Sequence, residues 1–417
     1  MTLAKIVSLS NLNGFIKKLK FEAGSRLRVT RWTGRRSPGL GDGRIAIMLR
    51  MKTNLPLRSS VPTPALVIDL AALERNIAVM AAAAAGWGVR LRPHAKSHKC
   101  VAIAARQVAA GALGVSCATL DEVAAMVAGG VSGLLLTSPI AGEPKFAQLE
   151  SLLRRDPSIV VVADDPAAVA ALDAVSNRVG AQIRVLVDFD VGQRRTGCRS
   201  VDAAVALAKE IRARSGLVFG GIQAYAGHIQ HIVAREARRS AVMAAADQVR
   251  KLRAALEGAG LEPQIVTGAG TGSVESDGPG GVYTELQPGS YIFMDTDYLA
   301  VEGLAERYST SLFVDTTVVG VQWDDHVTTD AGTKAFALNG PPPMSAVRES
   351  GWAYSYDGDE FGRITLDAGG RRPAWGERLA FVVSHCDPTV VLYPQFVCVR
   401  GERVEECWPI TPRHGGT

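Results

Sequence analysis

The sequence predicts an α/β protein with an N-terminal (β/α)8 barrel of the TIM type and a C-terminal all-β domain. Three observations support this fold class. Short apolar strands alternate with helix-like segments from about Thr63 onward. Residue types suited to chemistry follow the ends of those strands. After about Tyr308 the helical spacing stops, and segments rich in β-branched residues replace it.

Eight strand candidates are separated by segments rich in Ala, Arg, Glu and Leu. A strand-like run from Ala65 to Asp69 and an Ala-rich helical run from Leu73 to Ala85 precede them. Eight parallel strands over about 200 residues fit a closed barrel better than an open, doubly wound sheet, which is the alternative. The candidates are residues 89–91, 113–117, 134–137, 159–163, 183–187, 218–224, 264–267 and, more weakly, 283–286.

A barrel of this type carries its functional groups just after its strands, at the C-terminal mouth. Lys96 follows the first candidate strand, Arg195 lies in the loop after the fifth, and Tyr225 follows the sixth. A Gly-rich stretch from Thr267 to Ser273 follows the seventh. Each loop alone would be ordinary turn chemistry, but their joint placement indicates a functional site at the mouth.

This fold class divides the chain into a barrel at residues 64–305, a β domain at residues 306–417 and a leader. The leader, residues 1–50, holds 11 Lys and Arg residues against Glu22 and Asp42. We expect it to be disordered, or not translated if translation starts at Met48 or Met51. An Arg-rich transit peptide is the alternative.

The net charge of +5 comes from this leader, since residues 51–417 hold 35 Lys and Arg against 39 Asp and Glu. The charge therefore gives no indication of a nucleic-acid partner. No uncharged apolar run approaches the length of a membrane span, so no membrane partner is expected. The six cysteines show no CxxC spacing, as in a reduced cytoplasmic enzyme.

A lysine at a strand end and a phosphate-binding loop in one barrel indicate pyridoxal 5'-phosphate. Such a lysine can deliver its amine to a carbonyl cofactor. The stretch Thr267 to Ser273 offers backbone N–H groups and hydroxyls to a phosphate. It lacks the ending of a P-loop and opens no clear dinucleotide-binding unit, which leaves a phosphate monoester. The turn from Gln287 to Tyr291 could supply further contacts.

The β domain contains His385, Cys386 and Asp387 in a row. On an extended segment, residues i and i+2 point the same way, so His385 and Asp387 could share a divalent metal ion. The alternative is a surface loop with ordinary polar residues.

Taken together, these stretches resemble the D-threonine aldolase and D-serine dehydratase family, pyridoxal-phosphate enzymes of the alanine-racemase fold type. The resemblance runs from about Thr63 to Ile410. It is carried by Thr-Pro-Ala-Leu-Val at 63–67, Arg-Pro-His-Ala-Lys-Ser-His-Lys at 92–99, Asp-Val-Gly-Gln at 190–193 with Arg195, Gln-Ala-Tyr at 223–225, Gly-Thr-Gly-Ser at 270–273, Tyr-Thr-Glu-Leu-Gln-Pro-Gly-Ser-Tyr at 283–291 and Ser-His-Cys-Asp-Pro-Thr at 384–389.

The resemblance implies roles for individual residues. Lys96 would hold the cofactor as a Schiff base, and His385 and Asp387 would bind the metal. Residues 51–63 would join the β domain. Relatives of this fold often pair barrel against β domain, so a homodimer is the expectation. The remaining implied cofactor contacts are Thr271, Gly289 and Ser290 at the phosphate, Tyr298 at the cofactor, and Arg195 and Tyr225 near the ring and its phosphate.

The family divides at the metal motif. Its dehydratases resemble His-x-Cys with zinc, and its aldolases resemble His-x-Asp with a harder ion, so Asp387 favours manganese or magnesium over zinc. The expected reaction is metal-assisted cleavage of a D-3-hydroxy-α-amino acid to glycine and an aldehyde, with His385 or a metal-bound hydroxide near it as the base.

Two other functions stay open. One is a dehydratase that acts on D-serine or 3-hydroxyaspartate, and the other is a non-enzymatic cofactor-binding protein. Phe361 stands where the family often has His in an Asp-Glu-His-Gly turn, which leaves the substrate specificity open.

Overall fold

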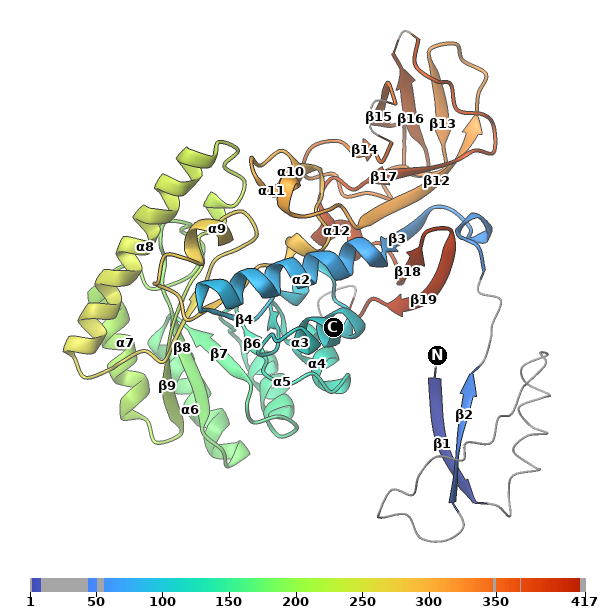
Figure 1. The fold of residues 1–417 in the computed structure, drawn as a ribbon. Coiled ribbons are helices and arrows are strands. Elements are labelled where there is room, and N and C mark those ends of the chain that lie inside the picture. The colour runs from blue at the N-terminus through green and yellow to red at the C-terminus, as the bar shows by residue number, and fades with distance from the viewer. Residues whose placement is uncertain (1, 9–43, 51–55, 348–349, 368, 413–417) are drawn as a thin grey trace. The chain divides into compact units, whose positions relative to one another are not determined.

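The computed structural model describes residues 2–8, 44–50, 56–347, 350–367 and 369–412 (Figure 1). The chain divides into two compact units, Met1–Pro56 and Leu57–Thr417. In the first unit, strands β1 (Thr2–Ser8) and β2 (Arg44–Arg50) pair antiparallel. The expectation that the leader is disordered or not translated stays a prediction. The remainder of residues 1–50 lies outside the described residues.

The second unit contains a barrel of eight parallel strands, in the order β4-β11-β10-β9-β8-β7-β6-β5. A parallel bridge between His94 and Ser116 joins the two ends of this order, so the strands close into a ring. All eight coincide with the predicted segments, including the weakest one. They are β4 (Arg90–Leu91), β5 (Ser116–Cys117), β6 (Leu135–Leu136), β7 (Val160–Ala163), β8 (Ile183–Asp188), β9 (Leu217–Ala224), β10 (Ile265–Gly268) and β11 (Glu285–Leu286).

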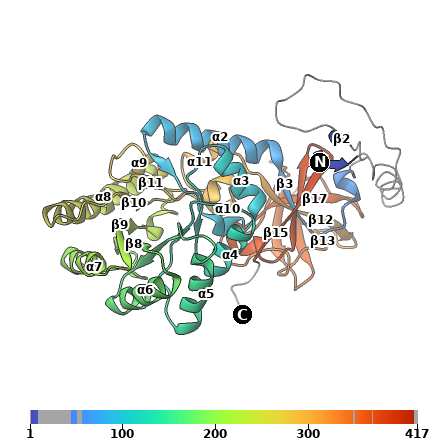
Figure 2. The same ribbon diagram turned by 90° about the horizontal axis from the view of Figure 1, so that it is seen from below.

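Helices connect successive strands and surround them, as Figures 1 and 2 show for α5 to α8. The longer ones are α2 (Leu70–Trp87), α3 (Val101–Ala109), α4 (Leu120–Ala128), α5 (Glu143–Leu153), α6 (Pro166–Val179), α7 (Val201–Ala213) and α8 (Arg235–Gly258). The short ones are α9 (Val274–Asp277), α10 (Thr296–Leu299) and α11 (Leu304–Arg307).

Local signals set where several of these helices begin and end. The side chain of Thr119 accepts a hydrogen bond from the Glu122 N–H at the start of α4. Asp165 does the same for α6, whose first residue is Pro166, and Gly180 ends that helix with φ +75°. Such caps satisfy backbone groups that the helix itself leaves unpaired.

The barrel interior has an apolar layer, formed by Leu135, Val160, Val162 and Leu186. Alternate residues of the same strands, such as Val161 and Val185, pack outward into the main core. The C-terminal ends of the strands carry buried polar side chains instead, including Asp188, Gln223 and Thr267. The barrel is therefore filled by apolar side chains and has a polar C-terminal mouth.

The second domain is built on a sheet of nine strands, ordered β15-β16-β13-β12-β3-β18-β19, in which β17 pairs with β12 and with β14. Its strands are β3 (Ala65–Asp69), β12 (Leu312–Gly320), β13 (His326–Thr329), β14 (Met344–Ser345), β15 (Trp352–Tyr356), β16 (Gly362–Leu366), β17 (Arg378–Val382), β18 (Gln395–Arg400) and β19 (Arg403–Pro409).

Two details of this domain bear on the site. Strand β3 pairs antiparallel with β12 and parallel with β18, so residues 65–69, which were expected to open the barrel, lie in the sheet of the second domain. The short helix α12 (Cys386–Val390) lies among the strands of this domain. Strand β3 leads into α2, and α12 carries Asp387.

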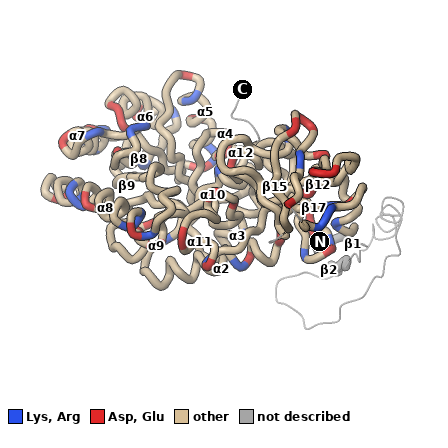
Figure 3. Tube along the Cα trace, turned by 90° about the horizontal axis from the view of Figure 1, so that it is seen from above, with Lys and Arg blue, Asp and Glu red and all other residues tan. Residues whose placement is uncertain are grey.

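Charged residues of both signs are interspersed along the barrel helices (Figure 3). Some pair within one helix, as Arg214 does with Glu210 and Arg253 with Glu257. All six cysteines are free thiols. In the described part of the chain, no helix combines the length and apolar character that crossing a membrane requires.

Candidate active site

The lysine loop, residues 94–99, follows β4 and holds Lys96 by local hydrogen bonds. The Lys96 N–H donates to His94 Nδ1 at 3.3 Å, and the Ser97 hydroxyl donates to the His94 carbonyl at 3.1 Å. His94 in turn contacts the Thr137 hydroxyl through Nε2 at 3.1 Å. Burial, reinforced by the nearby Lys96 charge, lowers the pKa of His94 well below its usual value. We therefore treat His94 as a neutral packing residue.

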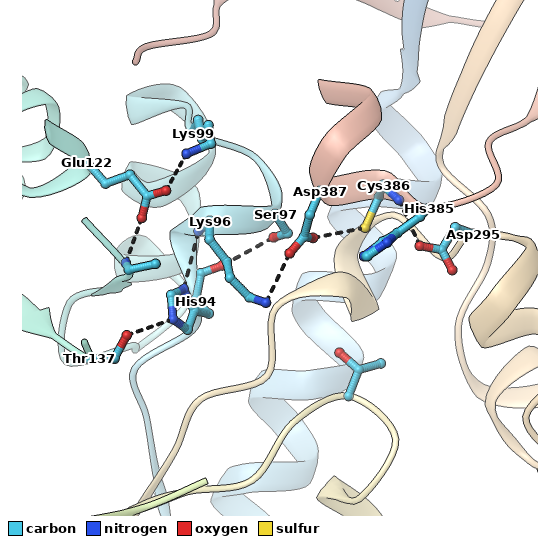
Figure 4. Close-up of polar contacts among 12 residues, drawn as sticks. His94, Lys96, Ser97, Lys99, Glu122, Thr137, Asp295, His385, Cys386 and Asp387 are labelled. Carbon is cyan, nitrogen blue, oxygen red and sulfur yellow. Dashed lines mark hydrogen bonds and ion pairs between the residues drawn. The ribbon is translucent and has the colours of Figure 1, made fainter. Parts of the chain in front are cut away.

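A buried ion pair fixes the far end of the lysine loop. Lys99, which has φ +48°, pairs with Glu122, whose second carboxylate oxygen accepts the Ala118 N–H at 2.6 Å. The Lys99 carbonyl also accepts a hydrogen bond from the Thr411 N–H at 2.8 Å. The loop is thus tied to the next barrel loop and to the end of the second domain (Figure 4).

The loop faces a cavity of about 320 Å³ at the C-terminal mouth of the barrel. All seven residues expected at the cofactor line it, although they come from six separate segments of the chain. They are Lys96, Arg195, Tyr225, Thr271, Gly289, Ser290 and Tyr298. The structure therefore brings the predicted set together in one cavity.

The Gly-rich loop meets this cavity at Gly270 and Thr271. Its next two N–H groups, of Gly272 and Ser273, are already taken by Gln230 Oε1 at 3.0 and 3.2 Å. Within this loop, only Gly270 and Thr271 are therefore left to contact a phosphate. A Cβ on Gly270 would lie 2.4 Å from the same Gln230 oxygen, so a larger residue here would force the Gln230 side chain to shift.

Gly289 supplies the second side of the phosphate region. A Cβ there would lie 3.3 Å from the His94 carbonyl, so glycine lets this turn pack against the lysine loop. Ser290 follows it in the cavity wall, and the Tyr291 N–H donates to the Thr271 hydroxyl oxygen at 3.0 Å. This hydrogen bond joins the two predicted phosphate-binding segments.

A buried polar network forms the floor of the cavity. The Gln223 amide donates to Asp188 at 2.9 Å and to the Thr137 carbonyl at 2.8 Å. Gln287 continues the network to the Thr267 hydroxyl at 2.9 Å. Burial raises the pKa values of Tyr225 and Tyr298 at the wall, so both phenols are neutral donors at physiological pH.

The expected metal pair lies on the other side of Lys96. Lys96 Nζ is 3.1 Å from Asp387 Oδ2. Burial opposes ionisation of Asp387, but attraction to Lys96 and His385 lowers its pKa to about 2. His385 and Asp387 do not lie on an extended segment as expected. His385 precedes α12 and Asp387 is in its first turn.

Two residues that the sequence interpretation left without a role hold this helix in place. Asp295, fully buried, accepts the Cys386 N–H at 2.8 Å and the Tyr298 N–H at 3.0 Å. The Cys386 thiol donates to Asp387 Oδ1 at 3.3 Å. The carboxylate of Asp295 thus holds both α12, at Cys386 (Figure 4), and Tyr298 at the cofactor cavity.

A third such residue is Asn339, whose side-chain amide contacts His385 Nδ1 at 2.8 Å. The only sequence signal for these residues was proximity to a recognised stretch, as for Asp295 three residues before Tyr298. Asn339 belongs to a loop of the second domain that no motif marked.

The residues present fit both groups that the resemblance implies. For pyridoxal phosphate, the cavity joins a lysine amine to hydroxyls and a glycine turn. For a divalent cation, His385 offers imidazole nitrogen and Asp387 a permanently ionised carboxylate. Among the described residues, no group of three or more His, Cys, Asp or Glu side chains is arranged as a metal site, so the fit concerns these two donors.

Comparison with known proteins agrees with the architecture. The family described as "Alanine racemase, N-terminal domain" matches residues 68–297, and "Putative serine dehydratase domain" matches residues 311–399. A D-threonine aldolase of Arthrobacter sp is 40% identical over 354 residues, covering 85% of this chain and 93% of that protein. A 3-hydroxy-D-aspartate aldolase of Paracoccus denitrificans (strain Pd 1222) is 35% identical, covering 86% and 94%.

Solved structures show the same fold. The crystal structure of D-threonine aldolase from Filomicrobium marinum matches with a TM-score of 0.84 at 38% identity, covering 87% of this chain and 99% of that chain. D-threo-3-hydroxyaspartate dehydratase from Delftia sp. HT23 matches with a TM-score of 0.77 at 26% identity, covering 87% and 100%.

Proposed function

This chain belongs to the D-threonine aldolase and D-serine dehydratase family, with its alanine racemase N-terminal domain, and we propose that it cleaves D-3-hydroxy-α-amino acids to glycine and an aldehyde. One observation carries the proposal. The amine that would hold the cofactor, Lys96 Nζ, lies 3.1 Å from Oδ2 of Asp387, the carboxylate that would bind the metal. The similarity to a D-threonine aldolase at 40% identity supports the carbon–carbon lyase class.

The barrel residues would hold pyridoxal 5'-phosphate. Lys96 would bind it covalently, with Thr271, Gly289 and Ser290 at the phosphate. Arg195, Tyr225 and Tyr298 would contact the cofactor from the remaining wall of the same cavity. When bound, the cofactor supplies an electron sink for the pair of electrons left by the broken carbon–carbon bond.

His385 and Asp387 would hold a divalent cation, manganese or magnesium rather than zinc because the second ligand is a carboxylate. When bound, the cation supplies Lewis acidity to the substrate's β-hydroxyl. As ligands of the cation, His385 and Asp387 would orient the substrate's β-hydroxyl. Its proton would pass to water beside these two ligands.

The second candidate is a dehydratase, because a D-threo-3-hydroxyaspartate dehydratase of Delftia sp. (strain HT23) is 31% identical over 307 residues. That reaction would remove the hydroxyl and keep the carbon–carbon bond. Asp387, where the dehydratase motif has Cys, favours the aldolase.

Product analysis with D-threonine separates the two reactions. The protein, loaded with pyridoxal phosphate and manganese, should release glycine and acetaldehyde, whereas a dehydratase would release 2-oxobutanoate and ammonia. L-Threonine and the Lys96→Ala variant serve as controls. The same assay applies to D-phenylserine, which would give glycine and benzaldehyde, and to 3-hydroxy-D-aspartate, which would give glycine and glyoxylate. Release of neither glycine with an aldehyde nor a 2-oxo acid with ammonia from any of the three substrates would remove the proposed function altogether.

A further inference from the structure

We propose that Asn339 is the positioning residue of His385: its amide holds Nδ1 and so leaves Nε2 as the nitrogen for the divalent cation. This inference rests on the metal site of the proposed function. Asn339 does not line the cofactor cavity. Its contact is with the ring nitrogen of His385, at 2.8 Å.

The loop that carries Asn339 is fastened to the segment that carries His385. The Ala337 N–H donates to the Thr389 hydroxyl at 3.1 Å, and that hydroxyl donates to the His385 carbonyl at 2.7 Å. The Ser384 hydroxyl donates back to the Ala337 carbonyl at 2.5 Å. Two hydrogen bonds at Ala337, one to Thr389 and one from Ser384, therefore join the two segments on either side of His385.

Gly340 lets the loop approach this closely. It has φ +123°, a conformation that side chains disfavour, and a Cβ there would lie 3.2 Å from the Ser384 carbonyl. The same Cβ would be 3.8 Å from the Cβ of His385. The backbone at Gly340 therefore packs directly against Ser384 and His385.

The chemistry of imidazole explains how the Asn339 contact can decide which ring nitrogen of His385 binds a cation. A neutral histidine carries its proton on one ring nitrogen and can bind a cation only through the other. A metal-binding histidine usually donates its remaining N–H to an outer acceptor, which fixes the ring and the tautomer. Asn339 Oδ1 can be that acceptor for Nδ1–H.

The amide as placed has Nδ2 toward Nδ1, the arrangement that puts the ring proton on Nε2. A half-turn of the amide exchanges its oxygen and nitrogen at the same place. A cation bound at Nε2 leaves the ring proton on Nδ1, which selects the amide orientation with Oδ1 toward Nδ1–H. Asn339 can pair with either tautomer of His385, because an amide carries both a donor and an acceptor.

Manganese titration of the pyridoxal-phosphate-loaded protein tests this by calorimetry, independently of turnover. Asn339→Leu and Asn339→Ala remove the acceptor and should weaken Mn²⁺ binding by about 10- to 100-fold. Asn339→Asp keeps an acceptor and should bind Mn²⁺ at least as tightly as the wild type. Asn177→Leu, on the exposed face of α6, should change nothing.

The added charge of Asn339→Asp needs its own control. Leu338→Asp places the same charge on the neighbouring exposed residue without a ring contact. If it tightened Mn²⁺ binding as much as Asn339→Asp does, the field rather than the hydrogen bond would be responsible, and the inference would fail.

Two further outcomes are informative. Wild-type-like Mn²⁺ binding by Asn339→Leu and Asn339→Ala would overturn the inference and leave the proposed function intact. No Mn²⁺ binding by the wild type, with no aldol cleavage, would instead overturn the metal site on which the inference rests. The absorbance of bound cofactor should be equal in all these variants, because Asn339 does not line its cavity.

Discussion

Lys96 of the barrel and Asp387 of the second domain form an ion pair, with 3.1 Å between Nζ and Oδ2. Neither domain therefore holds the whole candidate site. The barrel provides the amine and the cofactor cavity, and the helix α12 provides the carboxylate. The same carboxylate would face both the lysine and the metal, so the two parts of the chemistry can be tested by separate substitutions.

Lys96→Ala should abolish the yellow colour of the purified protein, because the amine that would hold the cofactor covalently is removed. Visible absorbance after dialysis measures this directly. Lys145→Ala, an exposed lysine of α5, is the matched control and should stay yellow. A yellow Lys96→Ala protein that survives dialysis would contradict the cofactor assignment.

Asp387→Cys should change the preferred metal from manganese or magnesium toward zinc, since a thiolate is a softer ligand than a carboxylate. Asp387→Ala should weaken manganese binding by at least about 100-fold, more than loss of an outer partner does. Competition titrations measure both. Asp202→Ala, on an exposed turn of α7, should leave binding unchanged. Equal manganese affinity in wild type and Asp387→Ala would place the metal elsewhere.

Gly270→Ala should weaken pyridoxal-phosphate binding by about tenfold or more, equivalent to about 1.4 kcal/mol. The added Cβ would lie 2.4 Å from Gln230 Oε1, which must then release the Gly272 and Ser273 amides or push the loop into the cavity. Fluorescence titration of the cofactor-free protein gives the affinity. The control is Gly86→Ala, where a Cβ meets no atom within 4 Å. Matching affinities for the two variants would argue against a phosphate at this loop.

Asp277→Asn should make stability less dependent on pH between about 4 and 7. Burial raises the pKa of Asp277 from 3.8 to about 7, so in this range the folded wild type keeps a proton that the unfolded chain has lost. The contribution of protonated Asp277 to the free energy of unfolding is full below about pH 4. As pH rises toward 7, this free energy falls by up to about 4 kcal/mol. The variant carries no such penalty.

Urea unfolding of wild type and Asp277→Asn at several pH values checks this. The difference in the free energy of unfolding should shift in favour of the variant as pH rises. Parallel pH profiles would show that Asp277 titrates normally in the folded state. Asp202→Asn, at an exposed position, should follow the wild type throughout.

The sequence was sufficient for the barrel strands and for the residues of the cofactor cavity. Strand ends of a barrel converge on one mouth, so positions after strands, such as Lys96 and Thr271, could be placed together before the structure was known. The roles of these residues stay predictions until tested.

The sequence was insufficient where tertiary contacts decide the outcome. Ala65 to Asp69 is apolar enough for either sheet, and only its pairing with β12 and β18 assigns it to the second. Asp387 lies on a helix because Asp295 holds the Cys386 N–H at its start, a contact between distant segments. Asn339 was missed for the same reason.

The pairing of β3 also sets the order in which this chain can fold during synthesis. As residues 65–69 leave the ribosome, the segments that will flank them, 312–315 and 397–399, have not been made. The whole barrel is synthesised before residues 312–315, so both edges of β3 stay unpaired until then, and one edge stays unpaired until residues 397–399 are made. Such long-range pairing slows folding and leaves apolar side chains and unpaired backbone groups open to other chains. The nascent protein should therefore depend on protection of β3 during synthesis.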